Sequence, residues 1–267
     1  MSINNYGFNN EGVITSEEIR QILEKYRIGK KPLAKLLGWG ETTIIRYMEG
    51  DIPTSEYSSK LRTILDNPEY YYDLLMQRKD CLTNVAFKKS KTAVLSKIMA
   101  SKIHAIAYYF IYKSDEEICA SYIQYLLYYC QAFSLALYDK ELFQEECIVN
   151  DEHLPYPKLY QSMKRCGIHK LDVGDEFITD EERKIIDKVY DIFLWYGPKT
   201  IHSLMNYEKS MMKISRDRLN NKILSKDCIR QYFKEACEKY DINDINNIGN
   251  YPNRCFEELK VQLSNIS

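Results

Sequence analysis

The segment from Lys30 to Tyr47, KKPLAKLLGWGETTIIRY, constrains the fold of this chain more than any other segment. Leu33 and Leu37 are four residues apart, so they share one face of a short helix. Gly38 follows them, at the end of the helix, where the backbone often takes a left-handed conformation. Glycine adopts this conformation without steric strain because it has no Cβ atom. Two short helices joined by such a turn form a helix-turn-helix. Its inner side has a small residue and then apolar residues, namely Ala34, Trp39, Ile44 and Tyr47.

The second helix of a helix-turn-helix reads bases in the major groove with its N-terminal part, so we expect this chain to bind DNA. The side chains left on the outer face are Glu41, Thr42, Thr43, Ile45 and Arg46. We expect Arg46 to contact a base edge or an adjacent phosphate, and Glu41 and Thr42 to lie at other base edges. Phosphate contacts are expected from Lys30, Lys31 and Thr43. In one alternative, the negative charge of Glu41 stabilises the N-terminus of the second helix and contacts no base. In another, the whole segment is an ordinary helical hairpin of an all-α protein that does not bind DNA.

Length and composition predict a helical protein of two domains. A chain of 267 residues exceeds the usual single-domain size, and ten glycines and seven prolines are few for a β-sandwich or a disordered chain. Charged residues interrupt every apolar run before the ~18 residues that a membrane span needs. The first residues, MSINNYGFNNEG, contain neither a basic nor an apolar segment typical of a secretory signal. We therefore expect a cytoplasmic protein that does not associate with membranes.

The charge is distributed unevenly along the chain. Residues 1–113 contain 17 Lys and Arg against 12 Asp and Glu, a net charge of +5. Residues 114–267 contain 20 basic and 26 acidic residues, a net charge of −6. The basic part suits contacts with phosphates, and the acidic part suits a protein partner that is neutral or basic.

The sequence contains no pattern of an enzyme, a metal site or a cofactor site. The eight cysteines include no CxxC pair and the four histidines are isolated, whereas structural zinc sites normally have close ligand pairs. No glycine-rich phosphate loop, HExxH pair or nucleophile elbow is present. Asp151 and Glu152 beside His153 would suit acid–base chemistry, but their position next to Pro155 is more typical of a solvated loop. We expect no enzyme, no metal and no cofactor, with reduced cysteines mostly in the core.

Helix-start signals divide the first 80 residues into five short helices. Thr15 and Glu18 form a capping box that opens the first helix. The two helices of the helix-turn-helix follow, and a fourth comes after the sequence EGDIP. Asn67 before Pro68 is typical of an N-cap with proline at the first helical position, and it predicts the fifth helix. We therefore expect a DNA-binding domain over residues 1–80.

Residues 81–113 are expected to form a basic linker helix. A single helix from Lys88 to Tyr112 would carry an apolar stripe of Leu95, Met99, Ile103, Ile106 and Phe110. The stripe either packs on the second domain or forms the seam of a homodimer that places two recognition helices one DNA turn apart.

The second domain, residues 114–267, is expected to be mostly helical with one or two short strands, which makes the whole fold mainly α. Capping boxes at Ser114–Glu117 and Thr179–Glu182 predict two helix starts. The segment ICASYIQYLLYYCQAFSLALY is apolar on nearly every side, as a buried central helix is. Strands are expected near residues 143–149 and within 168–177. Further helices are expected near Pro157–Arg165, 228–240 and Arg254–Leu263.

Tyrosine is abundant, with 23 residues, and it is enriched at interface hot spots. We expect tyrosines outside the central apolar helix to anchor a protein partner. The candidates are Tyr156 and Tyr160, in and just after the segment with Pro155 and Pro157, and Tyr207. In the alternative, AT-rich coding raised the tyrosine count, as it did the counts of Asn, Ile and Lys, without a functional role.

Residues 14–75 resemble the helix-turn-helix domain of MqsA-type antitoxins. That family has the pattern EEI, then LA-x-LLG, then GE-x-TI-x-RYE-x-G-x-IP, then NPEY. The corresponding segments here are EEI (17–19), LAKLLG (33–38), GETTIIRYMEGDIP (40–53) and DNPEY (66–70). The chain lacks the CxxC pairs of the zinc-binding module that some relatives carry.

Residues 114–240 resemble the Panacea, or SocA-associated, antitoxin domain. The similar segments are YLLYYCQAFSLALYDKELFQE (125–145), PKLYQSMK (157–164), ITDEERKIIDKVYDIFLWYG (178–197), SLMNYEKSMMKISR (203–216) and ILSKDCIRQYF (223–233). Relatives commonly have AW-x-x-GPV where this chain has VNDEHLPYP, and often a His and a Trp where it has MNYEKSMMK. These departures concern family interface residues more than the fold.

Together the two resemblances imply an antitoxin. The C-terminal domain would bind and mask a co-encoded toxin, and the N-terminal domain would bind the promoter of the same operon. Prophages and mobile elements are the usual setting of such pairs. The alternative is a prophage-type transcription regulator whose second domain senses a ligand or a protein.

Overall fold

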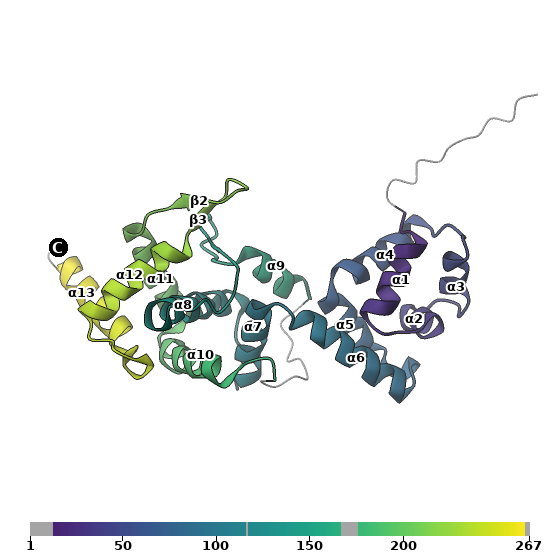
Figure 1. Cartoon of the computed structure of the whole chain (residues 1–267), viewed down its shortest axis with the longest axis horizontal. Helices are drawn as coiled ribbons and strands as arrows, with labels where there is room; N and C mark the ends of the chain where they lie inside the picture. Colours follow the sequence, from purple (N-terminus) through teal and green to yellow (C-terminus); the bar gives the residue numbers. More distant parts are fainter. Residues whose placement is uncertain (1–12, 116, 167–175, 265–267) are drawn as a thin grey trace, which may run out of the picture. The chain divides into compact units, whose positions relative to one another are not determined.

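The computed structural model describes residues 13–115, 117–166 and 176–264. The chain forms two compact units, Met1–Ile98 and Met99–Ser267, which we call the N-terminal unit and the C-terminal unit. Both are built from helices, and a small antiparallel sheet belongs to the C-terminal unit (Figure 1). The prediction of a mainly α fold is confirmed.

The N-terminal unit begins with the five short helices that the sequence predicts. The threonine at position 15 forms both hydrogen bonds of a capping box with Glu18, and the Asn67 side chain accepts a hydrogen bond from the backbone of Tyr70 at the start of the fifth helix. Both predicted helix starts are confirmed. The elements are α1 (Ser16–Lys25), α2 (Lys30–Leu37), α3 (Thr43–Met48), α4 (Ser55–Asp66), α5 (Pro68–Gln77), η1 (Lys79–Cys81) and α6 (Asn84–Ile98).

Two stacked tyrosines connect the helices of this unit. The rings of Tyr26 and Tyr71 are stacked with centroids 3.8 Å apart, and both side chains are buried. The hydroxyl of Tyr26 donates to the Ile64 carbonyl of α4 at 2.7 Å. The hydroxyl of Tyr71 is 2.6 Å from Oγ of the buried Ser90 in α6. Because each buried hydroxyl has a partner on another helix, the pair joins α1, α4, α5 and α6.

The predicted single linker helix is wrong. The segment forms two helices, α6 and α7 (Lys102–Lys113), with Met99 to Ser101 between them. Ser90 holds α6 to the N-terminal unit, whereas Lys113 of α7 pairs with Asp187 at 2.9 Å within the C-terminal unit. Packing of the two halves into different cores overrides the continuous helical pattern. The predicted dimer seam also loses its basis on α7, because its stripe residues are buried in the C-terminal unit: Ile103, Ile106 and Phe110.

The C-terminal unit surrounds the predicted apolar central helix, α8 (Ala120–Tyr138). The predicted capping box at Ser114–Glu117 is wrong: Ser114 ends α7, and Cys119 precedes the first turn of α8. The capping box of Thr179 and Glu182 is confirmed. The other elements are α9 (Pro157–Cys166), α10 (Asp180–Phe193), η2 (Leu194–Tyr196), α11 (Gly197–Met211), α12 (Lys226–Lys239), η3 (Ile245–Asn247) and α13 (Asn250–Ser264).

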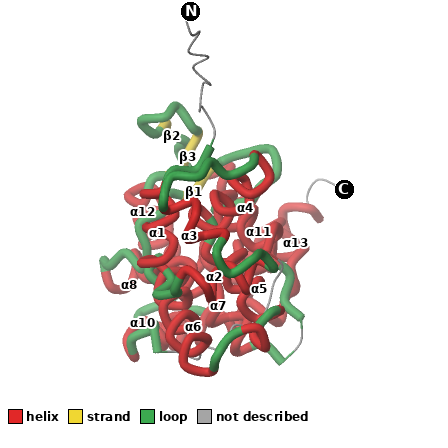
Figure 2. The backbone as a smooth tube through the Cα atoms, turned by 90° about the vertical axis from the view of Figure 1, so that its right-hand side faces the viewer, coloured by secondary structure: helices red, strands yellow, loops and turns green. Residues whose placement is uncertain are grey.

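A small sheet of order β1-β3-β2 lies at one end of the C-terminal unit, as Figure 2 shows. Its antiparallel strands are β1 (Cys147–Ile148), β2 (Ser215–Arg216) and β3 (Lys222–Leu224). The first strand lies within the predicted range 143–149. Most of the second predicted strand, in 168–177, is outside the described residues. The hairpin of β2 and β3 was not predicted, because strands of two and three residues are too short for periodicity to reveal.

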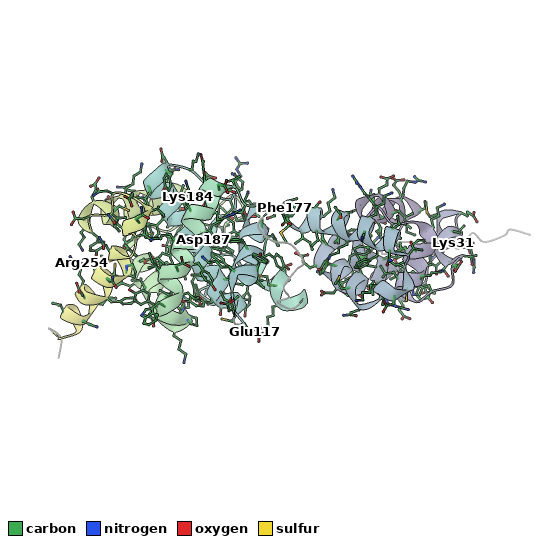
Figure 3. The ribbon with its side chains drawn as sticks, turned by 90° about the horizontal axis from the view of Figure 1, so that it is seen from below. Lys31, Glu117, Phe177, Lys184, Asp187 and Arg254 are labelled. Atoms are coloured by element: carbon green, nitrogen blue, oxygen red, sulfur yellow. The ribbon has the colours of Figure 1, made fainter. Side chains whose placement is uncertain are left out.

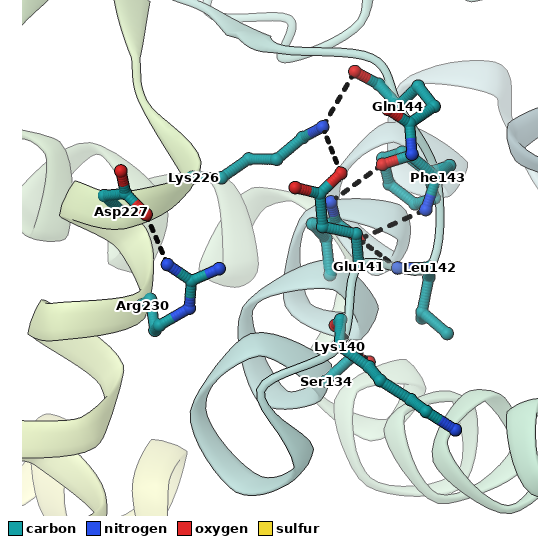
Figure 4. A network of polar contacts seen from close by, with 10 residues as sticks. Ser134, Lys140, Glu141, Leu142, Phe143, Gln144, Lys226, Asp227 and Arg230 are labelled. Atoms are coloured by element: carbon teal, nitrogen blue, oxygen red, sulfur yellow. Dashed lines mark hydrogen bonds and ion pairs between the residues drawn. The ribbon is translucent and has the colours of Figure 1, made fainter.

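Polar contacts fix the segment between α8 and β1 (Figure 4). The buried amide of Gln131 accepts a hydrogen bond from the Leu142 backbone at 2.8 Å and donates to the Phe143 carbonyl at 3.0 Å. The Lys226 ammonium is 2.7 Å from the Glu141 carboxylate and 2.9 Å from the Gln144 carbonyl. These bonds connect α8 and the start of α12 to the segment that leads from α8 to β1.

A buried carboxyl joins three helices of the C-terminal unit. Glu208 of α11 is fully buried, and the hydroxyls of Tyr129 of α8 and Tyr251 of α13 both donate to its Oε1 at 2.7 Å. Among the described residues, its Oε2 has no hydrogen-bond partner. Burial away from water raises the pKa of Glu208 to about 7, because desolvation penalises the charged form.

This raised pKa predicts that the C-terminal unit is less stable at neutral than at mildly acidic pH. The folded chain holds the Glu208 proton up to about pH 7, whereas the unfolded chain releases it near its ordinary value of 4.5. The free energy of unfolding should therefore fall by roughly 2–3 kcal/mol as the pH rises through this window. Urea unfolding at about pH 5 and about pH 7.5 measures the change.

The control for this prediction is Glu208→Gln, which retains an oxygen acceptor for the two tyrosines. His202 acts in the opposite direction, because desolvation lowers its pKa. The decisive quantity is therefore the difference in pH dependence between the wild type and the variant. Identical pH dependence in both proteins would contradict the assignment to Glu208.

Candidate nucleic-acid interface

The turn between α2 and α3 has the geometry that the sequence predicts. Gly38 has φ 76° and ψ 24°, in the left-handed region. The backbone N–H of Gly38 donates to the Lys35 carbonyl at 3.0 Å, and that of Trp39 donates to the Ala34 carbonyl at 2.9 Å. These bonds satisfy carbonyls at the end of α2 and direct the chain into α3. The left-handed conformation predicted at Gly38 is confirmed.

Aromatic contacts with α4 fix the rotation of α3. The Trp39 ring stacks on Tyr57 of α4 with centroids 4.2 Å apart, and Tyr47 meets the same ring edge-on at 6.4 Å. Ile44 is fully buried. With this side of α3 turned inward, the outer face consists of the exposed Glu41, Thr42 and Arg46 and the half-buried Thr43 and Ile45.

The structure adds an ion-pair partner for Arg46 that sequence reasoning missed. Nε of Arg46 is 2.7 Å from Oδ2 of Asp51, and the Asp51 backbone N–H donates to the Arg46 carbonyl at 3.0 Å. Both side chains are exposed. The sequence signal for this contact is an aspartate directly after Gly50, whose positive φ of 118° turns the chain back toward α3. Arg46 is therefore held at the surface in a defined position.

Glu41 pairs with lysines of α2. Its carboxylate is 3.0 Å from the Lys35 ammonium and 3.8 Å from that of Lys31. The hydrogen bond from Lys35 and the charges of both lysines lower the pKa of Glu41. In the free protein this carboxylate neutralises part of the positive charge of α2. Lys30 and Lys31 are exposed, and Figure 3 shows Lys31 at the surface of the N-terminal unit.

The predicted tyrosine anchors are only partly accessible. Tyr156 is buried, with its ring edge-on to Phe143 at 5.2 Å and its backbone N–H donating to Gln124 at 2.9 Å. The expectation that it is exposed is wrong, because the chain after Pro155 turns this side chain into the core. Tyr160 on α9 and Tyr207 on α11 are half-buried.

Other polar groups that the sequence singles out lie in a surface turn. Asp151 and Glu152 are both exposed. The His153 ring is 5.3 Å from that of His202, whose Nε2 is 3.0 Å from the Asn206 amide. Within the described residues no group of three or more His, Cys, Asp or Glu side chains could hold a metal ion.

Comparison with models of known protein families, with curated proteins and with solved structures gives no match. No helix in the described part of the chain is long and apolar enough to cross a membrane. Any functional assignment therefore depends on the chain's own geometry and on the sequence resemblances described above.

The turn geometry predicts that Gly38→Val destabilises the N-terminal unit. A β-branched residue at φ 76° is strained, and a Cβ atom there would lie 2.5 Å from Nη1 of Arg78. We expect a loss of about 1–3 kcal/mol in the free energy of unfolding, since Arg78 can move but the backbone strain remains. Thermal unfolding of residues 1–98 measures this loss.

Gly40→Ala is the matched control, because Gly40 has no positive φ and an added Cβ would make ordinary contact with Thr43 Oγ1 at 3.4 Å. If both variants melted at the wild-type temperature, the turn would not depend on its glycine.

Proposed function

We propose that this chain is an antitoxin that binds its own promoter through α2 and α3 and masks a co-encoded toxin through the C-terminal unit. The observation that carries the proposal is the geometry of the α2–α3 unit. The left-handed turn at Gly38 and the burial of Ile44 leave an outer face on and before α3 that is mostly polar, with Ile45 as its one apolar residue. The MqsA-type and Panacea resemblances support the antitoxin role.

In this proposal α3 enters the major groove and Arg46 reads a base edge. An arginine fork fits O6 and N7 of guanine with two parallel hydrogen bonds. In this proposal Arg46 exchanges the Asp51 carboxylate, which is 2.7 Å from its Nε, for the base. Phosphates would likewise compete with Glu41 for the lysines of α2, and Lys30, Lys31 and Thr43 would contact the backbone. In the free protein, the carboxylates of Glu41 and Asp51 thus occupy the cations that would contact DNA in the complex.

The C-terminal unit supports a separate role for the second half of the chain. It has its own core around α8, and the two units divide between Ile98 and Met99. A unit with its own core can bind a protein partner while the other unit of the same chain binds DNA. Such an arrangement suits an antitoxin that represses its operon while it neutralises a toxin.

The first prediction concerns DNA reading. Arg46→Ala should weaken binding to the promoter fragment by about 1–3 kcal/mol and relax its sequence preference. Asp51→Asn should strengthen binding roughly two- to fivefold, because an exposed ion pair holds Arg46 by at most about 1 kcal/mol. Lys30→Gln should reduce the slope of log K against log salt by about one unit for every sequence. Fluorescence anisotropy with labelled duplexes measures all three.

Wild-type affinity in Arg46→Ala would rule out this role of α3. A loss of affinity in Asp51→Asn would show that Asp51 positions Arg46 for DNA rather than competing with it.

The second prediction separates neutralisation from repression. Residues 99–267 should rescue growth when co-expressed with the protein encoded by the adjacent reading frame, whereas residues 1–98 should only shift promoter DNA. Full-length Arg46→Ala should still rescue growth, because masking needs no DNA contact. Colony counts under inducible expression provide the readout.

If rescue required residues 1–98 and was lost with Arg46, neutralisation would be transcriptional. Promoter binding without any rescue would instead indicate a transcription regulator.

A further inference from the structure

The hairpin of β2 and β3 extends from the helices of the C-terminal unit (Figures 1 and 2). Its turn is closed by Asp217, whose carboxylate accepts hydrogen bonds from the backbones of Leu219 and Asn221 at 2.9 and 2.8 Å and from the Asn221 amide at 2.8 Å. The Arg216 guanidinium donates to the Asn220 carbonyl at 3.0 Å. The hairpin therefore has a defined shape before any partner binds.

Large apolar side chains are exposed along this hairpin. Met211, Ile214 and Leu219 are 64%, 46% and 79% exposed, whereas the residues that anchor the hairpin, such as Ile223 and Leu224, are buried. Three such side chains within nine residues are more than isolated surface apolar residues would explain. A concentration of exposed apolar side chains on one segment is typical of an interaction site.

The same hairpin is basic. Residues 211–222 contain Lys213, Arg216, Arg218 and Lys222 and a single acid, Asp217. The three hydrogen bonds from Asn221 and Leu219 help lower the pKa of Asp217, so its carboxylate remains occupied within the turn. Among the ion pairs in the described part of the C-terminal unit, none joins a carboxylate to Lys213, Arg218 or Lys222, and all three side chains are exposed. The hairpin is thus positive although residues 114–267 carry a net charge of −6.

We propose that this basic hairpin, Met211–Lys222, is the surface through which the C-terminal unit binds an acidic partner protein. The inference rests on the proposed antitoxin function and names the partner surface: carboxylates around an apolar pocket that receives Leu219. It reverses the expectation, drawn from average charge, of a neutral or basic partner. Arginine and methionine are enriched in protein interfaces, and opposite charges steer the encounter.

One observation favours a protein over nucleic acid as the occupant. The exposed apolar side chains run from the base of the hairpin, at Met211, to its tip, and a phosphate backbone offers them no counterpart.

The closed turn also lowers the cost of association. A segment already held in its bound shape loses little conformational freedom on binding, so more of the contact energy appears as affinity. We therefore expect the contribution of the hairpin to appear mainly as slow dissociation, with charge affecting association.

The test uses the full-length chain and the purified protein encoded by the adjacent reading frame. The variants are Lys213→Glu with Arg218→Glu, and Leu219→Ser. The matched control is Lys199→Glu with Lys260→Glu, which makes the same charge change at exposed lysines elsewhere in the C-terminal unit. Calorimetric titration at about 50 and 300 mM NaCl measures affinity, and thermal unfolding with promoter binding verifies that each variant is folded.

We expect the charge-reversed hairpin to lose roughly 100-fold or more in affinity and most of its salt dependence, and Leu219→Ser to lose roughly tenfold at both salt concentrations. The control should bind within about threefold of the wild type. A folded hairpin variant that matches the control would overturn the inference and leave the antitoxin function intact.

Two other outcomes also decide the question. If the wild-type chain neither binds nor neutralises the adjacent protein, the antitoxin function fails and this inference fails with it. If the hairpin variants keep the protein partner but lose affinity for a mixed-sequence DNA duplex, the hairpin contacts nucleic acid and the proposal is wrong.

Discussion

Burial of α8 on all its sides organises the C-terminal unit. Helices α7, α9, α10, α11 and α12 all pack against it, and its rings of Tyr128, Tyr129 and Phe133 are fully buried among aromatic side chains. Because α8 is buried, the polar groups that it carries or contacts need specific hydrogen-bond partners, as the Gln131 amide has at Leu142 and Phe143. At the contact of α8, α11 and α13, the hydroxyls of Tyr129 and Tyr251 are satisfied by hydrogen bonds to the Glu208 carboxyl group.

The N-terminal unit depends on a different constraint, the backbone conformation of one residue. Gly38 ends α2 in the left-handed region, and the aromatic contacts of Trp39 and Tyr47 with Tyr57 then fix α3. Because these contacts bury one side of α3, they also decide which of its side chains form the outer face. A single glycine thereby connects a local backbone preference to the surface proposed to read DNA.

Charge acts locally in both units. The sequence average describes the N-terminal part as basic and the C-terminal part as acidic, yet Glu41 and Asp51 neutralise cations of the proposed DNA face. In the C-terminal unit the hairpin of Lys213 and Arg218 is basic within an acidic half. Since screening limits electrostatic reach to about 8–10 Å, a partner responds to such local groups and not to the net charge.

The sequence by itself determined most of the features that depend on neighbours along the chain, although the capping box expected at Ser114–Glu117 did not form. Capping boxes at Thr15 and Thr179, the N-cap at Asn67 and the left-handed Gly38 were all predictable, because each is a backbone requirement met within a few residues. The outer face of α3 followed from helical periodicity for the same reason. A buried α8 was likewise visible in the composition of one segment.

Only the tertiary structure decided what depends on contacts between distant segments. The pattern from Lys88 to Tyr112 continues without a break, but Ser90 and Lys113 have partners in different units, and so two helices form. Tyr156 is buried because its ring packs against Phe143 and its backbone N–H donates to Gln124. Glu208 accepts hydrogen bonds from two tyrosines on helices that are distant in sequence. Such outcomes are set by the free energy of packing and desolvation, which no local pattern records.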